Sequence, residues 1–411
     1  MNNKLFKKIN SCRICGNDDL AIVLDLGDQP PANSLRDNIE EELPRIPLQL
    51  ACCRLCGAAQ LSVSVNPEYL FKHYVWVTGT AETTRKYSIE FCSRMLERLP
   101  LGRPLKIIEV ASNDGTFLKP FKVKGHELLG IDPAENIVKM ANEDGINTIS
   151  EFFSSELAGK IISGFGEADC IFARNVVPHV EDAHDVIEGM GRCLDEKGLG
   201  AIEFHYAGTI HNELHYDSIY HEHNLYLSLS CLSKMLEKHG LFCFDISESP
   251  ISGGSIVAYF SKHRREQSEN FKKKILREKN DNLNSVSAWI DFSRRAVKHK
   301  DELLNLIKGV PSKMIGYGAS ARSSTILNFC GIDRRVLSCI ADNSPLKQGK
   351  YTPGTDIKIF SPDIAFQSKP ESVLLLAWNF SDEILRELHD KYEFSGTVVV
   401  PFPGNPRIPK S

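Results

Sequence analysis

The sequence predicts an α/β protein with two Rossmann-like, doubly wound domains and a small N-terminal zinc-binding domain. Two stretches, residues 106–132 and 313–342, each read as strand, small-residue turn, helix and strand, and each ends on an aspartate. Strands that alternate with helices indicate parallel sheets. Paired cysteines near the N-terminus predict the metal domain. The expected domains are residues 1–72 (zinc), 73–245 (central) and 246–411 (C-terminal).

The first unit predicts a nucleotide-type ligand site. Ile107, Ile108 and Val110 form a short apolar run typical of a buried parallel strand. The turn at residues 111–115 has no bulky side chain, so the backbone can approach a ligand closely. Pro120 limits the helix that follows, and the second apolar run ends on Asp132. An acid at the tip of the second strand is placed to hydrogen-bond a ribose diol.

The ligand of this unit is expected to be S-adenosylmethionine rather than a dinucleotide. The frame Glu109-x-Ala111-x-Asn113-x-Gly115 lacks the glycines of a G-x-G-x-x-G phosphate turn. An acid on the first strand suits a cationic ligand, and S-adenosylmethionine has a ribose, an amino group and a sulfonium but no phosphate. The alternative is an ordinary strand–helix–strand unit with no ligand.

Two C-x-x-C-G knuckles predict a structural zinc site. Cys12 and Cys15 form one pair and Cys53 and Cys56 the other, each followed by glycine. Four thiolates make a closed tetrahedral site with no position open for catalysis. The glycine after Cys56 and the matching spacing favour Cys53 over Cys52 as the ligand. Unpaired buried thiols, or a zinc ribbon that reads nucleic acid, are the alternatives.

Polar residues beyond two further strands predict an acid–base site. His179 follows the strand expected near residues 169–174, and the strand near residues 199–203 leads into a segment rich in His and Tyr. Strand ends at the same sheet edge converge on a ligand, and these residue types suit proton transfer. The segment contains His205, His211, His215, Tyr216, Asp217, Tyr220, His221, Glu222, His223 and Tyr226. A metal site at residues 221–223 and a polar loop with no chemistry are the alternatives.

The second unit is a possible phosphate cradle. Gly316 and Gly318 precede a helix whose first turn holds Arg322, which would pair with a phosphate. An NAD site is the alternative use, although the third glycine is missing. Lys350 and Tyr351 add polar loop residues at the same edge. Residues 262–307 are helical in pattern.

Composition excludes several classes of function. The chain has 411 residues, 42% hydrophobic and 25% charged, with a formal net charge of -4. That balance argues against nucleic acid as a partner. No apolar run reaches the length of a membrane span, and no apolar segment follows the basic start as in a signal peptide. A cytoplasmic location with no membrane partner is expected, and the protein is expected to be a monomer or a homodimer.

Four segments together resemble the S-adenosylmethionine-dependent C-methyltransferases that act on nucleotide-linked 4-keto deoxysugars. They are CRICG with CRLCGAAQL, EVASNDGTFL, YHEHNLYLS, and GYGASARSSTILNFCGI with DNSPLKQGKYTPG. The resemblance implies an N-terminal zinc clip, a central S-adenosylmethionine domain and a C-terminal domain that helps to hold the nucleotide-sugar. The chain departs from the family's usual pattern at Thr78-Gly79-Thr80, at Ser252 and at Leu227, all near the expected sugar pocket.

The residue patterns and the resemblance together give the expected roles. Zinc ligands are Cys12, Cys15, Cys53 and Cys56; cofactor residues are Glu109, Ala111, Asn113, Gly115, Asp132 and Asn175. Catalytic residues are His223 (the favoured base), Tyr220, Glu222 and His179, and substrate residues are Tyr74, Arg322, Lys350 and Tyr351. The expected reaction removes a proton from carbon 3 of a 4-keto-6-deoxysugar and methylates that carbon. The alternatives are methylation of oxygen or another carbon, a nucleotide-sugar oxidoreductase that uses NAD, and a zinc-dependent scaffold without activity.

Overall fold

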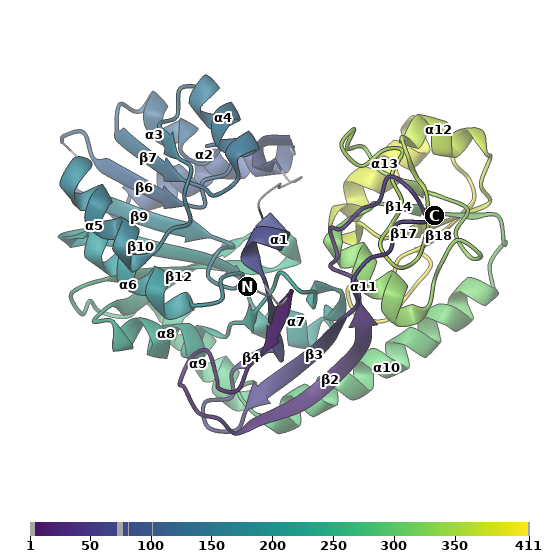
Figure 1. Ribbon diagram of the computed structural model, residues 1–411, viewed down its shortest axis with the longest axis horizontal. Coiled ribbons are helices and arrows are strands. Elements are labelled where there is room, and N and C mark those ends of the chain that lie inside the picture. The colour runs from purple at the N-terminus through teal and green to yellow at the C-terminus, as the bar shows by residue number, and fades with distance from the viewer. Residues whose placement is uncertain (1–4, 72–76, 81, 101, 410–411) are drawn as a thin grey trace.

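The computed structural model describes residues 5–71, 77–80, 82–100 and 102–409. Two lobes stand side by side; the strands β2 and β3 lie below the gap between them, and the long helix α10 runs from there below the right-hand lobe (Figure 1). Within the described ranges, no helix is long and apolar enough to cross a membrane.

The N-terminal part is built on an antiparallel four-stranded sheet in the order β11-β4-β3-β2. Its strands are β2 (Leu20–Gln29), β3 (Ile46–Cys53), β4 (Ala59–Leu61) and β11 (Leu225–Tyr226). Smaller elements flank it: β1 (Phe6–Lys8) paired with β5 (Val63–Val65), α1 (Pro67–Phe71) and η1 (Thr78–Thr80). Because β11 comes from the His- and Tyr-rich segment, where Leu225 pairs with Gln60, that segment is fixed to the N-terminal sheet.

The central domain contains a seven-stranded sheet in the order β12-β13-β10-β9-β6-β7-β8. Its strands are β6 (Lys106–Val110), β7 (Glu127–Ile131), β8 (Thr148–Ile149), β9 (Ala168–Arg174), β10 (Leu194–His205), β12 (Phe242–Ser249) and β13 (Ser255–Ser261). The strands β6 to β10 are parallel, and β13 runs antiparallel to β10 and β12. Ile107 and Ile108 belong to two separate hydrophobic clusters because successive side chains point to opposite faces of a strand.

Helices connect and cover these strands. They are α2 (Glu82–Leu96), α3 (Lys119–Val123), α4 (Glu135–Glu143), α5 (Ser155–Gly164), α6 (Ala183–Cys193), α7 (Ala207–Asn212), η2 (Tyr216–Ser218) and α8 (Leu229–Lys238). Pro120 lies in the first turn of α3, which is only five residues long.

The C-terminal lobe contains a five-stranded parallel sheet in the order β16-β15-β14-β17-β18. Its strands are β14 (Met314–Tyr317), β15 (Ile340–Ala341), β16 (Ile359–Phe360), β17 (Ser372–Leu375) and β18 (Thr397–Val399). Of the helices that follow β12 in the chain, η3 (Ile251–Gly253) connects β12 to β13 and α9 (Glu269–Asn280) packs against β12 of the central domain. The later helices are α10 (Val286–Lys308), α11 (Ala321–Cys330), α12 (Pro362–Gln367), η4 (Trp378–Phe380) and α13 (Ser381–Asp390).

Two predictions about boundaries need correction. The boundary placed between residues 245 and 246 cuts β12, because β12 and β13 add to the edge of the central sheet. The central sheet therefore extends to Ser261. The helical pattern over residues 262–307 forms two helices, since the chain turns after Asn280 and Ser285 accepts a hydrogen bond from Ala288 N to start α10.

Candidate functional site

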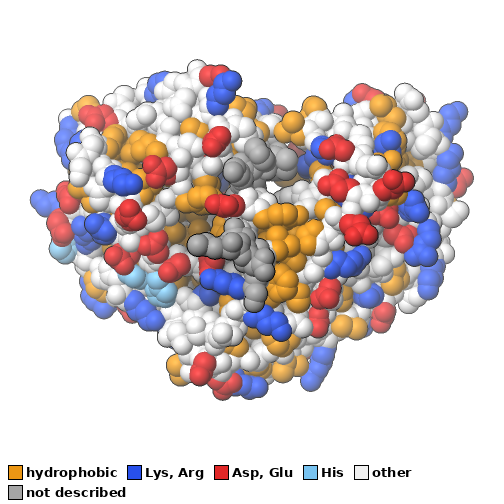
Figure 2. Space-filling model, in the orientation of Figure 1, with side chains coloured by type: hydrophobic (Ala, Val, Ile, Leu, Met, Phe, Trp, Pro, Cys, Tyr) orange, Lys and Arg blue, Asp and Glu red, His pale blue; other side chains and the backbone are white. Residues whose placement is uncertain are grey.

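A cavity of about 950 Å³ lies at the carboxyl ends of the central strands. Ala111, Asn113 and Asp132 from the first unit line it together with Ser320 and Arg322 from the second. The surface is hollowed between the two lobes (Figure 2). The carboxyl edge of an open α/β sheet is the usual place for a ligand.

The turn after β6 is shaped by Asp132. The Asp132 carboxylate accepts hydrogen bonds from Asn113 N and Ala134 N, both at 2.9 Å. Burial raises the pKa of Asp132, whereas the two backbone donors lower it. Ala111 and Asn113 have positive φ values of 53° and 49°, which are uncommon for non-glycine residues and mark a strained turn. The Asp132 carboxylate therefore lies at the cavity wall, and its contact with a ribose stays a prediction.

Two of the expected cofactor residues lie behind this wall. Glu109 and Gly115 are not among the described residues that line the cavity. Gly115 has a φ of +72°, and a Cβ there would lie 2.9 Å from Ile146. Glu109 is 2% exposed, and within the described chain its Oε2 has no hydrogen-bond partner. Burial raises the pKa of Glu109 well above its ordinary value, while nearby Arg174 lowers it.

The exit of β9 adds Asn175 and a buried ion pair to the cavity wall. Asn175 has a φ of 52°, and its backbone N donates to Glu203 O at 2.8 Å. Arg174 donates from Nε to Glu203 Oε2 at 2.7 Å, and its guanidinium lies 3.0 Å from the centre of the Phe117 ring. The sequence analysis assigned no role to Arg174 or Glu203, because nothing in their spacing marks them as partners.

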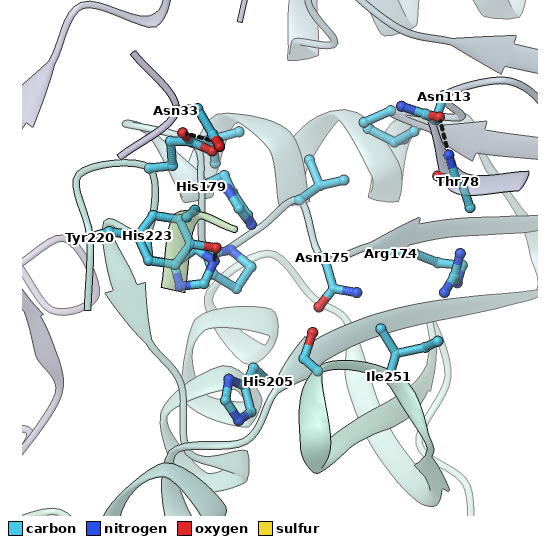
Figure 3. Close-up of a pocket in the computed structure, with 18 of the residues that line it drawn as sticks. Asn33, Thr78, Asn113, Arg174, Asn175, His179, His205, Tyr220, His223 and Ile251 are labelled. Carbon is cyan, nitrogen blue, oxygen red and sulfur yellow. Dashed lines mark hydrogen bonds between the residues drawn. The ribbon is translucent and has the colours of Figure 1, made fainter. Parts of the chain in front are cut away.

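Tyr220 and His223 form a hydrogen-bonded pair on the cavity wall, with 2.7 Å between the hydroxyl and Nε2 (Figure 3). The other ring nitrogen, Nδ1, lies 2.8 Å from Ser218 O. A carbonyl only accepts, so Nδ1 carries the proton and Nε2 of the neutral ring accepts from Tyr220. Burial lowers the pKa of His223 well below its ordinary value, and His179, whose ring centre is 4.5 Å away, adds to this. The pair is therefore a neutral proton acceptor.

Glu222 lines the same cavity. Burial raises its pKa to about 7, and Asn33 donates from Nδ2 to its Oε1 at 2.6 Å. Asn33 comes from the N-terminal part, and only its turn-rich surroundings could have drawn attention to it. His221 lies apart from this pair, 3.2 Å from Ile46 O. The groups of potential metal ligands in the described chain do not include residues 221–223.

The second unit forms the opposite wall, but it is not an open phosphate cradle. The Ser320 hydroxyl accepts from Ser323 N and the Ser323 hydroxyl from Ser320 N, which caps α11 with its own side chains. Arg322 donates to both oxygens of Asp217 at 2.9 and 3.0 Å, and Trp378 Nε1 donates to Asp217 at 2.7 Å. Arg322 lines the cavity with its guanidinium already occupied by a buried carboxylate.

Two of the predicted substrate residues, Lys350 and Tyr351, do not line the cavity. Lys350 donates to Asp37 at 2.8 Å, and Tyr351 forms bridges with Arg36 and Lys358, so both lie where the C-terminal domain meets the N-terminal segment. Lys347, from the same loop, lines the cavity instead, with Nζ 3.4 Å from Asp342. Tyr74 falls outside the described residues.

The four predicted zinc ligands come together. The Sγ atoms of Cys12, Cys15, Cys53 and Cys56 all lie within 4.8 Å of one another, with pairs at 3.6 Å. A tetrahedral Zn–S₄ site has sulfur atoms about 3.8 Å apart, so this set fits zinc. Cys52 is outside the cluster, and burial raises its pKa to about 12, as expected for a thiol that packs rather than binds.

The cavity edge at the first unit also fits the expected cofactor. Besides Asp132, the acidic side chains of Glu68, Glu181, Asp182, Asp185 and Glu222 line the cavity as a whole. Of the cationic groups on the described wall, Arg174 and Arg322 are paired with carboxylates and Lys347 lies beside Asp342. This edge suits a ligand with a ribose and positive charges, as the sulfonium and amino group of S-adenosylmethionine provide.

Comparisons with known proteins agree with this assignment. Residues 12–71 match a family described as a zinc binding domain, residues 83–243 a methyltransferase domain, and residues 250–403 a C-methyltransferase C-terminal domain. The fold and the site thus define an S-adenosylmethionine-dependent methyltransferase with a zinc-binding domain. The chain is 30% identical to the C-methyltransferase NovU from Streptomyces niveus over 411 residues, 98% of each chain. It belongs to the family of S-adenosylmethionine-dependent C-methyltransferases.

Solved methyltransferase structures match only part of the chain. The plantazolicin methyltransferase BpumL in complex with SAH is 18% identical, with a TM-score of 0.36, over 45% of this chain and 85% of that one. Magnesium protoporphyrin IX methyltransferase from Synechocystis PCC 6803 with bound SAM is 14% identical, with a TM-score of 0.32, over 43% of this chain and 77% of that one.

Proposed function

We propose that the protein methylates carbon 3 of a nucleotide-linked 4-keto-6-deoxysugar. The observation that carries the proposal is the Tyr220–His223 hydrogen bond of 2.7 Å, on the wall of the cavity that Asp132 also lines. A buried, neutral proton acceptor beside the cofactor edge suits the removal of a proton from carbon. The sugar class rests on the resemblance described above, and the relative is itself named a C-methyltransferase.

The residues of this chain have separate tasks in the proposed reaction. The ketone at carbon 4 makes the proton on carbon 3 acidic. The Tyr220 hydroxyl takes that proton while its own proton moves to His223 Nε2. The imidazole of His179 stabilises the enolate oxygen. When bound, S-adenosylmethionine would supply the electrophilic methyl group, carried on its sulfonium, for carbon 3.

This assignment refines the prediction that His223 is the base. His223 remains the destination of the proton, but its Nε2 is occupied by Tyr220 and its Nδ1 by Ser218 O. Contact between the imidazole and the sugar would require Tyr220 to leave. NAD chemistry at the second unit is not proposed, because α11 is capped by Ser320 and Arg322 is held by Asp217.

The test measures two products in the same reactions. Mass spectrometry with S-adenosylmethionine and a panel of nucleotide 4-keto-6-deoxysugars should detect one added methyl group. Without S-adenosylmethionine but in deuterated water, one deuterium should enter carbon 3. His223→Ala and Tyr220→Phe should both lower these rates by roughly 10²- to 10⁴-fold.

Tyr392→Phe is the matched control, because it removes a hydroxyl that bonds to Asp363 in the C-terminal lobe at 2.7 Å. Full exchange in Tyr220→Phe together with loss in His223→Ala would show that His223 acts on the sugar directly. A wild-type protein that binds S-adenosylmethionine but methylates no sugar of the panel would overturn the proposed function.

A further inference from the structure

A second chain of titratable side chains starts at the cavity wall. His205, the last residue of β10, lines the cavity, and its Nε2 lies 3.3 Å from Nδ1 of His215. Nε2 of His215 in turn lies 3.2 Å from Glu213 Oε2. The side chain of His215 is 0% exposed, whereas that of Glu213 is 48% exposed. The three groups therefore connect the cavity with solvent; His205 is seen below the Tyr220–His223 pair in Figure 3.

The proposed reaction leaves one proton in this cavity at every turnover. A C–H bond of the sugar breaks and a C–C bond forms, while the sulfonium loses its methyl group and becomes a neutral thioether. The proton that left carbon must reach water before the next cycle. The groups that receive it first, Tyr220 and His223, are themselves bonded to one another and to Ser218 O.

We propose that His205, His215 and Glu213 conduct this proton from the cavity to solvent. The inference rests on the function proposed above. Glu213 Oε2 lies 3.2 Å from His215 Nε2 without forming a hydrogen bond in this structure, so the relay requires the half-exposed Glu213 side chain to turn until its carboxylate accepts from Nε2. With the proton of His215 on Nε2, its Nδ1 accepts from His205 Nε2. A proton taken up at His205 Nδ1 then moves the next proton to His215 and a third to Glu213. No electrons move, and each ring ends in its other tautomer.

The electrostatic surroundings of His205 and His215 disfavour a long-lived imidazolium cation, so that a proton is passed on rather than held. Arg322, His215 and His223 face His205, whereas Arg322, Asp217 and Glu213 face His215. Burial lowers the pKa of His205 well below its ordinary value, and it lowers the pKa of His215 as well, with Arg322 adding to both effects. Both rings are neutral at rest, and a cation formed on either one is driven toward the carboxylate of Glu213.

The experiment compares Glu213→Gln and His205→Gln with wild type. Glu213 is half exposed, so its substitution leaves the packed core intact. We expect both variants to lower kcat by about 10-fold and to raise the solvent deuterium isotope effect, with KM unchanged within about 2-fold. The double variant should be no slower than His205→Gln alone, since both residues serve one path. His211→Gln is the control, because that ring belongs to α7 but bonds to Ala288 O at 3.0 Å.

The outcomes separate the relay from the function. Unchanged kcat and isotope effect in His205→Gln and Glu213→Gln, in a wild type that methylates sugars, would overturn the relay alone. A wild type without methylation would overturn the proposed function. In that case, NMR of the imidazole nitrogens of the full chain still tests the relay. Glu213→Gln should change the tautomers of His215 and His205, and unchanged tautomers would exclude the relay.

Discussion

The two strand–turn–helix–strand units of this protein share a backbone design. In the first, Asp132 accepts from Asn113 N and Ala134 N, both at 2.9 Å. In the second, Asp342 accepts from Ala319 N at 2.7 Å and from Ser344 N at 2.8 Å. In both units, an aspartate that ends the second strand fixes the turn after the first.

The side chains around this common frame differ. Asp132 lines the cavity, and α3 has no side-chain cap at its start. In the second unit Lys347 lies 3.4 Å from Asp342, and the capped helix α11 turns Arg322 toward Asp217. The comparison teaches that the backbone motif alone does not make a ligand site. Such a unit can bind a ligand only if its aspartate carboxylate and its helix N-terminus still face open space.

The largest difference between the units is expected at their glycines. Gly318 has a φ of +99°, and a Cβ there would lie 2.4 Å from Ala377 Cβ and 2.9 Å from Ala377 N. Gly115 has a φ of +72° and would meet the flexible side chain of Ile146 at 2.9 Å. Gly318→Ala should therefore lower the unfolding free energy by about 3 kcal/mol and Gly115→Ala by about half of that.

Thermal unfolding of the full chain measures both variants. Gly349→Ala is the control for backbone strain, because its φ is +84° but no atom lies within 4 Å of the added Cβ. Equal losses in all three variants would show that the close approach of Ala377 to the second turn carries no weight.

The next effect concerns the two aspartates. Asp132→Asn removes a charged acceptor at the cavity wall, whereas Asp342→Asn makes the same change at a carboxylate that faces Lys347. We expect the dissociation constant of S-adenosylmethionine to rise by roughly 10- to 100-fold in Asp132→Asn, the cost of a charged hydrogen bond. In Asp342→Asn it should change by less than about 3-fold. Titration calorimetry measures both values, and similar losses would mean that Asp132 acts only through the fold.

Local patterns were sufficient for the parts of the molecule that depend on near neighbours. The cysteine spacing correctly identified the cluster, including Cys53 over Cys52. The pattern of apolar runs and small turns identified the α/β, Rossmann-like fold, and the family resemblance identified the methyltransferase class. Long-range partners were beyond its reach: Asn33 contacts Glu222 across 189 positions, and Arg322 contacts Asp217 across 105. No spacing rule encodes such pairs, because each depends on how whole domains pack.

The smallest effect is expected at Glu109, whose counterpart in the second unit is found by aligning the strands of the two units. Ser112 N donates to Ile131 O just as Gly318 N donates to Ala341 O, so Glu109 in β6 corresponds to Ile315 in β14. Ile315 is fully buried among apolar side chains, whereas the equally buried Glu109 leaves Oε2 without a partner in the described structure. The first unit thus carries a carboxylate where the second has a hydrocarbon side chain.

Glu109→Gln should stabilise the protein in a pH-dependent way. Burial raises the pKa of Glu109 well above its ordinary value, so over the interval between its unfolded and folded pKa the folded state binds more protons than the unfolded one. Stability is therefore lost as the pH rises through that interval, and glutamine, which does not ionise, avoids this loss. The gain should be about 1–2 kcal/mol at pH 8 and should vanish below the unfolded pKa of about 4.3. Glu203→Gln should instead destabilise the protein, because it breaks the buried ion pair with Arg174.

Urea unfolding across this pH range measures the change in stability. Titration of the same samples with S-adenosylmethionine measures the change in affinity. Glu109 lies behind the cavity wall, so its replacement should weaken the cofactor less than Asp132→Asn does. If stability rises while the affinity for S-adenosylmethionine is unchanged, the buried carboxylate of Glu109 destabilises the fold and contributes nothing to cofactor binding. A loss of affinity as large as that of Asp132→Asn would instead show that the charge of Glu109 acts on the cofactor through the turn. The second unit has no equivalent of this effect, because Ile315 occupies the same strand position.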